Sequence, residues 1–595
     1  MPSIAAAMDL AREHYAAGRL REAEDLCRQV LDREPSRGDA LHLLGVLAHL
    51  GGRNANAIEL IGRAAGLDPD NAELHFNLGV AHQVSGQLAE AAKSYRESLR
   101  LDGRRPELHN NLGYTLLCLG QLDDALASFA QAIHLRPEFA EAWANRGEAL
   151  LRYGRFSEAA ECLRHALQLR PNFPEADNHL GVVLRSLGQL EEAAECFHRV
   201  LRQRPDFAGA HNNLGRVCEE VGRLDEAAAR YRLALCYQPS DAAIHTNLAN
   251  VLVTQGKAAE ALPSHQRAVE LQPNYALLHR NLAHTLTLLG RPDEAEECCR
   301  EALRLQPDFA DAHHNLAITL AAQGRIDQAL ASNEDALTLQ PEHPGARNCR
   351  ALWWLQTGDF ERGWREYEWR WKVRGVAQRK FPQPLWDGSP LEGRTLLIYA
   401  EQALGDTLQF IRYLPLVRQR VGRVVVECQP ALEGLLRNCP EIEHLIPRGS
   451  PLPDCDFQIP LLSLPAVFGT TMATIPARVP YLVAPSERID RWRSELPDSV
   501  FKIGIAWQGS PTFAGDSLRS IPLAQFASLG RIPGVQFFSL QKGPGREQLR
   551  AIPTYFHITD LGPRLDLDGA FLDTAAIMKS LDLVVSSDTA IAHLA

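Results

Sequence analysis

Cysteine pairs with metal-binding spacing are absent from this 595-residue sequence. Its twelve cysteines include no CxxC pair, and the one adjacent pair, Cys298 and Cys299, falls within a helical pattern. Zinc sites and disulfide frameworks need more regular spacing, so we expect neither, and we expect no metal and no cofactor. A reducing, cytoplasmic location fits this cysteine usage best.

Long apolar runs are also missing. The first residues, MPSIAAAMDLAREHYAAG, bring in Asp9, Arg12 and Glu13 before any apolar stretch of signal-peptide length. No later stretch reaches the roughly 20 apolar residues that a membrane-spanning helix needs. We therefore expect a soluble protein without a membrane span.

An excess of positive charge is the third absence. The chain carries 62 lysines and arginines against 73 aspartates and glutamates, for a net charge of -11. Proteins that bind nucleic acid usually show a basic patch or tail, so we expect no nucleic-acid partner. A chain of this length must divide into several units.

Glycine recurs every 34 residues through the first three-fifths of the chain, without an insertion. The positions are Gly18, Gly52, Gly86, Gly120, Gly154, Gly188, Gly222, Gly256, Gly290, Gly324 and Gly358. A small residue stands seven positions before each glycine and another five positions after it, and a proline ends nearly every repeat. The spacing predicts closely packed helix pairs joined by glycine turns. It resembles the tetratricopeptide repeat family, which implies eleven repeats over residues 1–365, stacked into an α-α superhelix (a solenoid) with an extended concave surface.

Asparagine occupies a further position, two residues before the first small residue of most repeats. It is found at Asn77, Asn111, Asn145, Asn213, Asn247, Asn281 and Asn315. Because a repeat position recurs on one face of a solenoid, these amides should form a ladder that can pair with the backbone of an extended peptide. The arrangement resembles the asparagine ladder by which O-linked N-acetylglucosamine transferases hold protein substrates. Hydrogen bonds between neighbouring helices explain the asparagines equally well.

Tryptophan concentrates where the repeats end, with six of the nine residues between Trp353 and Trp386. Phe360, Trp364, Tyr367 and Trp371 are spaced by four, three and four residues and so share one helical face. We expect a capping helix whose aromatic face docks the repeats on the next domain. Residues 366–393 are assigned to this capping helix and a proline-containing linker.

Strand-like and helix-like segments alternate from residue 394 onward. The predicted strands are 395–400, 423–428, 444–447, 457–462, 502–507, 535–540, 556–561 and 583–586; the predicted helices are 406–417, 430–437, 486–496, 523–529, 546–551 and 571–580. This rhythm predicts parallel, doubly wound α/β sheets. We expect two Rossmann-like domains, residues 394–497 and 498–595, with a cleft between them.

Five segments in this region carry a second family resemblance. They are LWDGSPLEGRTLLIYAEQALGDTLQFIRYLP, IGIAWQGSP, RSIPL, FFSLQKGP and DLVVSSDTAIAHLA, between Leu385 and Ala595. Together they resemble the glycosyltransferase-like module of many bacterial tetratricopeptide proteins, which is similar to the family 9 glycosyltransferases, the heptosyltransferases. The resemblance implies a GT-B double Rossmann fold, with an acceptor side in the first domain and a nucleotide-sugar side in the second.

Asp406 is the candidate catalytic residue that this resemblance implies. It stands after a glycine at the end of the first strand, the place of the proposed base that deprotonates the acceptor hydroxyl. A carboxylate there can accept a proton and offset positive charge on the sugar. Capping of the following helix explains Asp406 just as well.

The donor-binding candidates stand at the strand ends of the second domain. They are Gln541, Lys542, Asp588, Thr589 and His593, with Trp507, Gln508 and Gly509 as weaker candidates. Lys542 could meet a phosphate, and Asp588 and Thr589 open a helix whose free N–H groups suit a diphosphate. Metal-independent transfer is implied.

Two functions remain open on these residues. The first is a glycosyltransferase that moves a sugar from a nucleotide-sugar to a protein or peptide held by the repeats. The second is a non-catalytic scaffold for protein–protein interaction with a degenerate α/β region. Because the sequence stops seven residues after Asp588, with an apolar end, we expect the second Rossmann-like domain to be incomplete and the chain to be a fragment.

Overall fold

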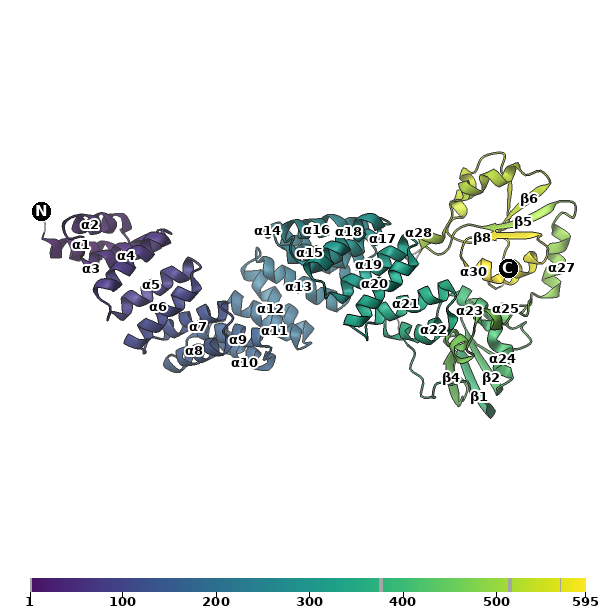
Figure 1. The fold of residues 1–595 in the computed structure, drawn as a ribbon, viewed down its shortest axis with the longest axis horizontal. Helices are drawn as coiled ribbons and strands as arrows, with labels where there is room; N and C mark the ends of the chain where they lie inside the picture. The colour runs from purple at the N-terminus through teal and green to yellow at the C-terminus, as the bar shows by residue number, and fades with distance from the viewer. Residues whose placement is uncertain (1–2, 374–377, 512–515, 568) are drawn as a thin grey trace. The chain divides into compact units, whose positions relative to one another are not determined.

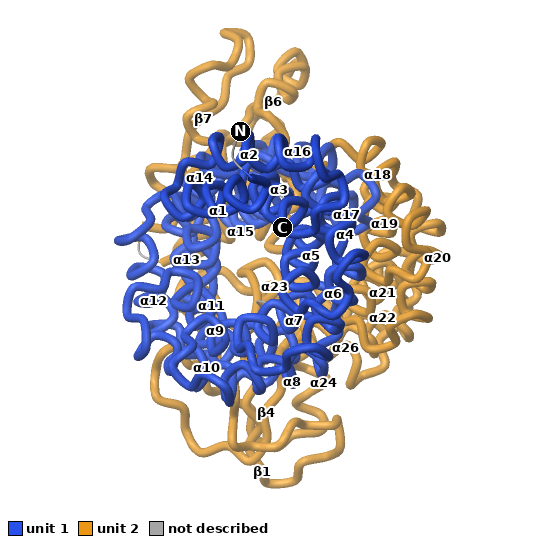
Figure 2. Tube along the Cα trace, turned by 90° about the vertical axis from the view of Figure 1, so that its left-hand side faces the viewer, with its two compact units in different colours: residues 1–285 blue, residues 286–595 orange. Residues whose placement is uncertain are grey.

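The computed structural model describes residues 3–373, 378–511, 516–567 and 569–595. The chain, drawn as a ribbon in Figure 1, divides into two compact units, residues 1–285 and 286–595, which Figure 2 colours separately. The boundary falls within the repeats, between Thr285 and Leu286, rather than at their end. Residues 374–377 of the expected linker lie outside the described residues.

Eleven helix pairs fill the region in which eleven repeats were expected. They are α1 (Ile4–Ala16), α2 (Leu20–Arg33), α3 (Gly38–Leu50), α4 (Asn54–Leu67), α5 (Ala72–Val84), α6 (Leu88–Leu101), α7 (Pro106–Cys118), α8 (Leu122–Leu135), α9 (Ala140–Tyr153), α10 (Phe156–Leu169), α11 (Pro174–Ser186), α12 (Leu190–Gln203), α13 (Ala208–Glu220), α14 (Leu224–Tyr237), α15 (Ala242–Thr254), α16 (Ala258–Leu271), α17 (Ala276–Leu288), α18 (Pro292–Leu305), α19 (Ala310–Ala322), α20 (Ile326–Leu339), α21 (Pro344–Thr357) and α22 (Phe360–Glu366). No helix in the described ranges is long and apolar enough to cross a membrane.

The small residues of the repeat let the two helices of a pair touch. A methyl group at Gly113 of α7 would lie 2.7 Å from Phe129 of α8, and one at Gly181 would lie 2.6 Å from Phe197. Each aromatic ring therefore occupies the space that a side chain on the facing helix would need. The recurring turn glycines adopt positive φ, from +69° at Gly290 to +89° at Gly358, which explains why glycine recurs there.

A histidine in the first turn of many repeats ties each helix pair to the preceding one. The ring Nε2 of His211 bonds the carbonyl oxygen of Pro205, and His245 and His279 bond Pro239 and Pro273 in the same way, at 2.7 to 3.0 Å. These prolines follow the ends of helices, where backbone carbonyls lack a helical partner. The histidines thus satisfy a carbonyl group at the junction between repeats.

Unit 1, taken by itself, winds about a common axis, as the end-on view in Figure 2 shows. The first helix of a pair lies nearer the axis than the second: α5, α7, α9 and α11 are inside α6, α8, α10 and α12. The predicted superhelix is therefore present in unit 1. The ladder asparagines of this unit stand on the inner set of helices.

The aromatic end of the repeats packs on the α/β region within unit 2. The expected capping helix is broken: α22 ends at Glu366, and a 3₁₀ helix, η1 (Tyr367–Lys372), continues from it. Trp364 meets Phe410 edge-on, with ring centroids 5.7 Å apart. Through this contact the end of α22 packs against α23 of the α/β region.

Two four-stranded parallel sheets follow, as the alternating pattern predicted. Their strands are β1 (Leu391–Tyr399), β2 (Val421–Cys428), β3 (His444–Pro447), β4 (Phe457–Pro460), β5 (Phe501–Ala506), β6 (Val535–Ser539), β7 (Ile558–Asp560) and β8 (Leu583–Ser586). The orders are β3-β2-β1-β4 and β7-β6-β5-β8, so both sheets have the same topology. Tyr399 pairs with Glu427 in the first sheet, and Ile505 pairs with Ser539 in the second.

Short helices surround these strands. They are α23 (Leu404–Phe410), η2 (Ile411–Tyr413), α24 (Leu414–Arg418), η3 (Pro430–Leu432), α25 (Glu433–Leu436), η4 (Leu461–Ser463), α26 (Leu464–Val467), η5 (Met472–Thr474), α27 (Ser486–Glu495), α28 (Asp516–Arg519), η6 (Leu523–Arg531), η7 (Arg546–Ala551), α29 (Leu572–Met578) and α30 (Ala590–Leu594). The predicted helices 523–529 and 546–551 are 3₁₀ helices, and both are short segments between prolines.

Substitutions at two glycines should separate close packing from helix propensity. Gly113→Ala should lower the midpoint of urea unfolding, because its methyl group would overlap Phe129 and cost about 1 to 3 kcal/mol. Gly62→Ala is the matched control: nothing lies within 4 Å of a methyl group there, so higher helix propensity should raise the midpoint. Equal shifts in both variants would contradict the packing argument.

Candidate functional site

The residues predicted for chemistry follow β1 of the first sheet and β5, β6 and β8 of the second. In each sheet the strand order reverses between a first and a fourth strand, at β1 and β4 and at β5 and β8. In parallel α/β sheets such a reversal leaves a crevice at the carboxyl ends of the strands, where ligands bind. Asp406 follows β1, and Asp588 follows β8.

Asp406 lies in the first turn of α23. The helix begins at Leu404, two residues earlier than predicted, and Asp406 Oδ2 accepts a hydrogen bond of 3.0 Å from the backbone N–H of Ala403. Asp406 therefore closes the turn between β1 and α23. The bond fixes the carboxylate at the carboxyl end of the first sheet.

The two α/β regions meet at this turn. A methyl group at Gly405 would lie 2.8 Å from His593 Cδ2 of α30, so α23 and α30 pack closely at the boundary between the two α/β regions, where the sequence predicted a cleft. Burial raises the pKa of Asp406; the Ala403 N–H and His593 lower it, and Asp588 raises it. Asp406, Asp588 and His593 thus come together from the two α/β regions.

Glu401 and Gln402, which were not among the predicted site residues, anchor the loop before Asp406. Glu401 Oε1 accepts a 2.9 Å bond from Arg370 of η1, and Gln402 donates a 3.0 Å bond to the Tyr367 hydroxyl. Glu401 stands directly after an apolar strand, a position where a charge is costly unless it is paired. A charged residue directly after an apolar strand is the feature of the sequence that could have indicated the Glu401 ion pair.

Gln541 is buried and fully engaged. Its side-chain oxygen accepts bonds from the backbone N–H groups of Trp507 and Gln508, and its nitrogen donates to the carbonyls of Gln508 and Pro544. The side chain joins the loops after β5 and β6. In the structure these bonds hold the two loops together.

The three weaker candidates also make internal contacts. Trp507 is fully buried and donates from Nε1 to the Gly545 carbonyl, and Gln508 Oε1 accepts from Gln548. A methyl group at Gly509 would lie 2.4 Å from Asp516 Oδ1. Trp507 therefore belongs to the core beneath the loops.

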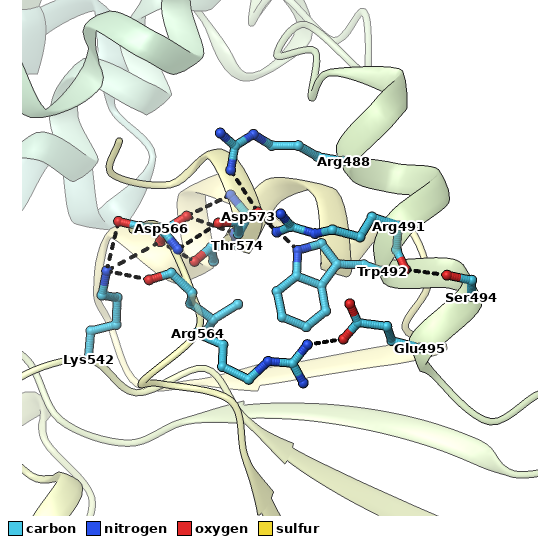
Figure 3. A network of polar contacts seen from close by, with 11 residues as sticks. Arg488, Arg491, Trp492, Ser494, Glu495, Lys542, Arg564, Asp566, Asp573 and Thr574 are labelled. Atoms are coloured by element: carbon cyan, nitrogen blue, oxygen red, sulfur yellow. Dashed lines mark hydrogen bonds and ion pairs between the residues drawn. The ribbon is translucent and has the colours of Figure 1, made fainter. Parts of the chain in front are cut away.

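Lys542 borders a polar network around α29 (Figure 3). Its ammonium donates a 2.9 Å bond to the carbonyl of Leu565, and its side chain keeps 45% exposure. Asp566 accepts bonds from the N–H groups of Asp573 and Thr574. The loop that holds Lys542 is thereby fixed to the start of α29.

The same network docks α27 on the second α/β region. Asp573 accepts hydrogen bonds from Arg488, Arg491 and Trp492 of α27 (Figure 3). Burial alone would raise the pKa of Asp573, but the bonds from Trp492 and Arg488 hold it below its ordinary value. The connecting helix is thus held by a buried carboxylate.

Asp588 and Thr589 precede a short helix. Asp588 is exposed, Thr589 is the residue before α30, and the Thr589 hydroxyl lies 3.2 Å from that of Ser586. His593 lies within this single helical turn, four residues after Thr589. In the described ranges, no three His, Cys, Asp or Glu side chains group closely enough to hold a metal ion.

The ladder asparagines make contacts between repeats in unit 1. The amide nitrogens of Asn145, Asn213 and Asn247 donate to Asn110, Asn178 and Asn212 of the preceding repeat at 2.9 to 3.1 Å. Asn77 makes the equivalent contact with His42. The alternative structural role is therefore observed at these positions. These four asparagines remain partly exposed, whereas Asn281 is buried.

Family models match the repeat region. The model of the cilia and flagella-associated protein 70 C-terminal domain matches residues 42–276, and two tetratricopeptide repeat models match residues 8–72 and 274–342. Protein FlbA of Caulobacter vibrioides is 26% identical over 269 residues, or 41% of this chain and 45% of FlbA. The chain thus spans about half the length of this curated relative.

Solved structures resemble the repeats at low overall scores. YrrB, described as a TPR protein with an unusual peptide-binding site, is 26% identical with a TM-score of 0.29, covering 32% of this chain and 98% of YrrB. A chain of the APC/C hetero-tetramer Cut9–Hcn1 is 13% identical with a TM-score of 0.38, covering 63% of this chain and 95% of its own length.

Removing the Gln541 side chain should destabilise the second α/β region. Gln541→Ala leaves buried backbone groups of Trp507 and Gln508 without partners, at a cost of about 2 to 4 kcal/mol. Lys542→Ala, the neighbouring control, should cost less, about 1 kcal/mol, because it removes one bond to a backbone carbonyl from a side chain that is 45% exposed. Thermal unfolding of both variants checks this, and equal stabilities would refute the cross-linking role of Gln541.

Glu401 should make stability fall as pH rises. Burial raises the pKa of Glu401 from 4.5 to about 7, against the opposing effect of Arg370. Between these values the folded state binds the proton more tightly than the unfolded state, so its contribution decreases with pH, by up to about 3 kcal/mol. Glu401→Gln should flatten urea-unfolding stability between about pH 5 and pH 8, whereas Glu392→Gln, at an exposed position of β1, should not.

Proposed function

We propose that this tetratricopeptide repeat protein transfers a glycosyl group from a nucleotide-sugar to a protein or peptide that its repeats bind. The α/β pair, as a GT-B-like module, supplies the reaction and the repeats supply the acceptor. Asp406 is the residue that receives the proton of the acceptor hydroxyl.

One observation carries the proposal: the turn after β1 and the helix after β8 meet, so that the charges of Asp588 and His593 act on Asp406. The turn and the helix each follow a strand at which the sheet order reverses. Two such reversals facing each other provide one side for an acceptor and one side for a nucleotide. The five sequence segments that resemble family 9 glycosyltransferases supply the same side chains.

The chemistry requires a base and an anion-binding side. An acceptor O–H gives its proton to the Asp406 carboxylate, its oxygen bonds to the anomeric carbon of the sugar, and the nucleoside diphosphate leaves with the electron pair of the broken bond. Burial raises the pKa of Asp406 and so makes its carboxylate a stronger base. Lys542 is the cation proposed for the diphosphate: its side chain is 45% exposed, and its ammonium also bonds the Leu565 carbonyl and pairs with Asp566 at 3.9 Å.

The repeats suit an extended polypeptide. In unit 1 each of the four contacts between repeats uses one N–H group of an asparagine side chain. The same amide has a second N–H group and a carbonyl oxygen. The ladder can therefore join repeats and still present polar groups to a peptide backbone. Under this proposal both explanations of the asparagines hold together.

A non-catalytic scaffold is the second candidate, and the engaged side chains favour it. Gln541, Gln508 and Asp406 all take part in internal hydrogen bonds. A region kept only for docking would retain such bonds without binding a nucleotide. The two candidates therefore differ in nucleotide binding.

Calorimetry with the full chain decides between them. We expect one member of a panel of UDP, GDP, ADP, CDP and dTDP to bind, and we expect Lys542→Ala to weaken that binding by about tenfold through loss of a charged contact. Asp588→Ala tests the loop before α30 in the same titration. Absence of binding by all five nucleotides would support the scaffold.

Transfer itself is tested with Asp406→Asn. Asparagine can still accept the Ala403 N–H bond, so the turn should persist while transfer of labelled sugar falls about a hundredfold or more. Asp387→Asn is the matched control, since Asp387 accepts bonds from Ser389 in the loop before β1. An unchanged rate in Asp406→Asn would rule out its role as the base.

A further inference from the structure

The 3₁₀ helix η1, which follows the last repeat, bonds to the loop before Asp406. η1 is a 3₁₀ helix with three residues per turn, so Tyr367 and Arg370 stand on one edge of it. Tyr367 receives the bond from Gln402, and Arg370 donates to Glu401. Two adjacent residues of the loop are therefore held by two residues of one helical edge.

Arg370 is the centre of this contact. Its Nη1 donates to Glu368 at 2.8 Å and to the Tyr367 carbonyl at 3.2 Å, while its Nη2 donates to Glu401 at 2.9 Å and to Ser463 after β4 at 2.8 Å. The Arg370 and Glu401 side chains are only 4% and 5% exposed. A buried pair of this kind stays in place because removal of one partner leaves the other charge without compensation.

The charges around Glu401 link this contact to the candidate site. Arg370 and Glu368 face it from η1, Asp406 from α23 and Tyr399 from β1. The negative charge of Asp406 raises the pKa of Glu401, which shows repulsion between the two carboxylates. Arg370 offsets this repulsion and lets both carboxylates occupy one short loop.

We propose that Arg370 is a positioning residue: η1, directly after the last repeat, holds residues 401–406 in the conformation that directs Asp406 toward α30. The inference rests on the proposed function only in taking Asp406 as the reacting carboxylate. A partner that alters the packing of η1 on α21, the last long repeat helix, would change the order of this loop, because η1 packs on α21 and bonds to the loop. The repeats thus act on the reaction as well as on the acceptor.

Hydrogen exchange of the full chain, read by mass spectrometry, tests the contact without a substrate. In Arg370→Gln, amides of residues 401–410 should exchange about tenfold faster, because local opening no longer breaks the pair. Arg370→Lys keeps the charge and should restore part of the protection. Lys372→Gln is the matched control on the same 3₁₀ helix, with a side chain 58% exposed, and should leave these amides unchanged.

A double-mutant cycle separates positioning from general destabilisation. Glu401→Gln alone should speed exchange of the same amides, and Arg370→Gln with Glu401→Gln should be no faster than the faster single variant, since both remove one interaction. If Arg370→Gln unfolds the α/β region, Glu401→Gln decides alone, because the Arg370 bonds within η1 persist. Wild-type exchange of 401–410 in Glu401→Gln, or equal acceleration throughout residues 391–595, would overturn the proposal.

Failure of the proposed function can be distinguished from failure of the positioning role by different measurements. The exchange results stand whether or not any nucleotide binds. If transfer is observed, Arg370→Gln should lower kcat about tenfold at unchanged KM for the nucleotide-sugar, because the donor side is intact. A rise in KM alone, with kcat unchanged, would contradict a positioning role for Arg370.

Discussion

Close approach of two backbones at a residue without a large side chain is the constraint on which this structure depends. Within the repeats, Gly113 leaves room for Phe129, and equivalent small residues do the same along the array. Between the two α/β regions, Gly405 leaves room for His593. In both places a ring fills the space that a side chain would take, and dense packing then fixes the relative position of the elements.

The junction converts this packing into a specific loop conformation. Trp364 provides apolar contact with Phe410, and Arg370 and Tyr367 add polar contacts to the loop after β1. A buried arginine among carboxylates costs desolvation energy and is kept only when each charge has partners. Here the partners come from η1, from the loop and from Ser463, so the pair requires all three segments to be in place.

The candidate site combines structural and chemical demands on the same residues. Asp406 closes a turn and also interacts electrostatically with Asp588 and His593. Four ladder asparagines join repeats while remaining partly exposed. Gln541 differs, because its polar groups are all directed into the two loops that it joins. The distinction rests on geometry: a side chain with spare hydrogen-bonding groups can serve a ligand, and one whose groups are all engaged serves the fold.

The sequence alone determined the repeats, the two parallel sheets and the positions of most strands, because a 34-residue period and alternating apolar segments express local rules of helix and strand formation. It also selected Asp406 and Asp588, which follow strands, and His593, which the resemblance to the family 9 glycosyltransferases implied. Only the tertiary structure decided that these three meet, that Trp507 is core, and that Glu401 pairs with Arg370, 31 residues earlier in the chain. Such contacts depend on how separate elements pack against one another, and no local pattern of residues specifies which distant segments come into contact.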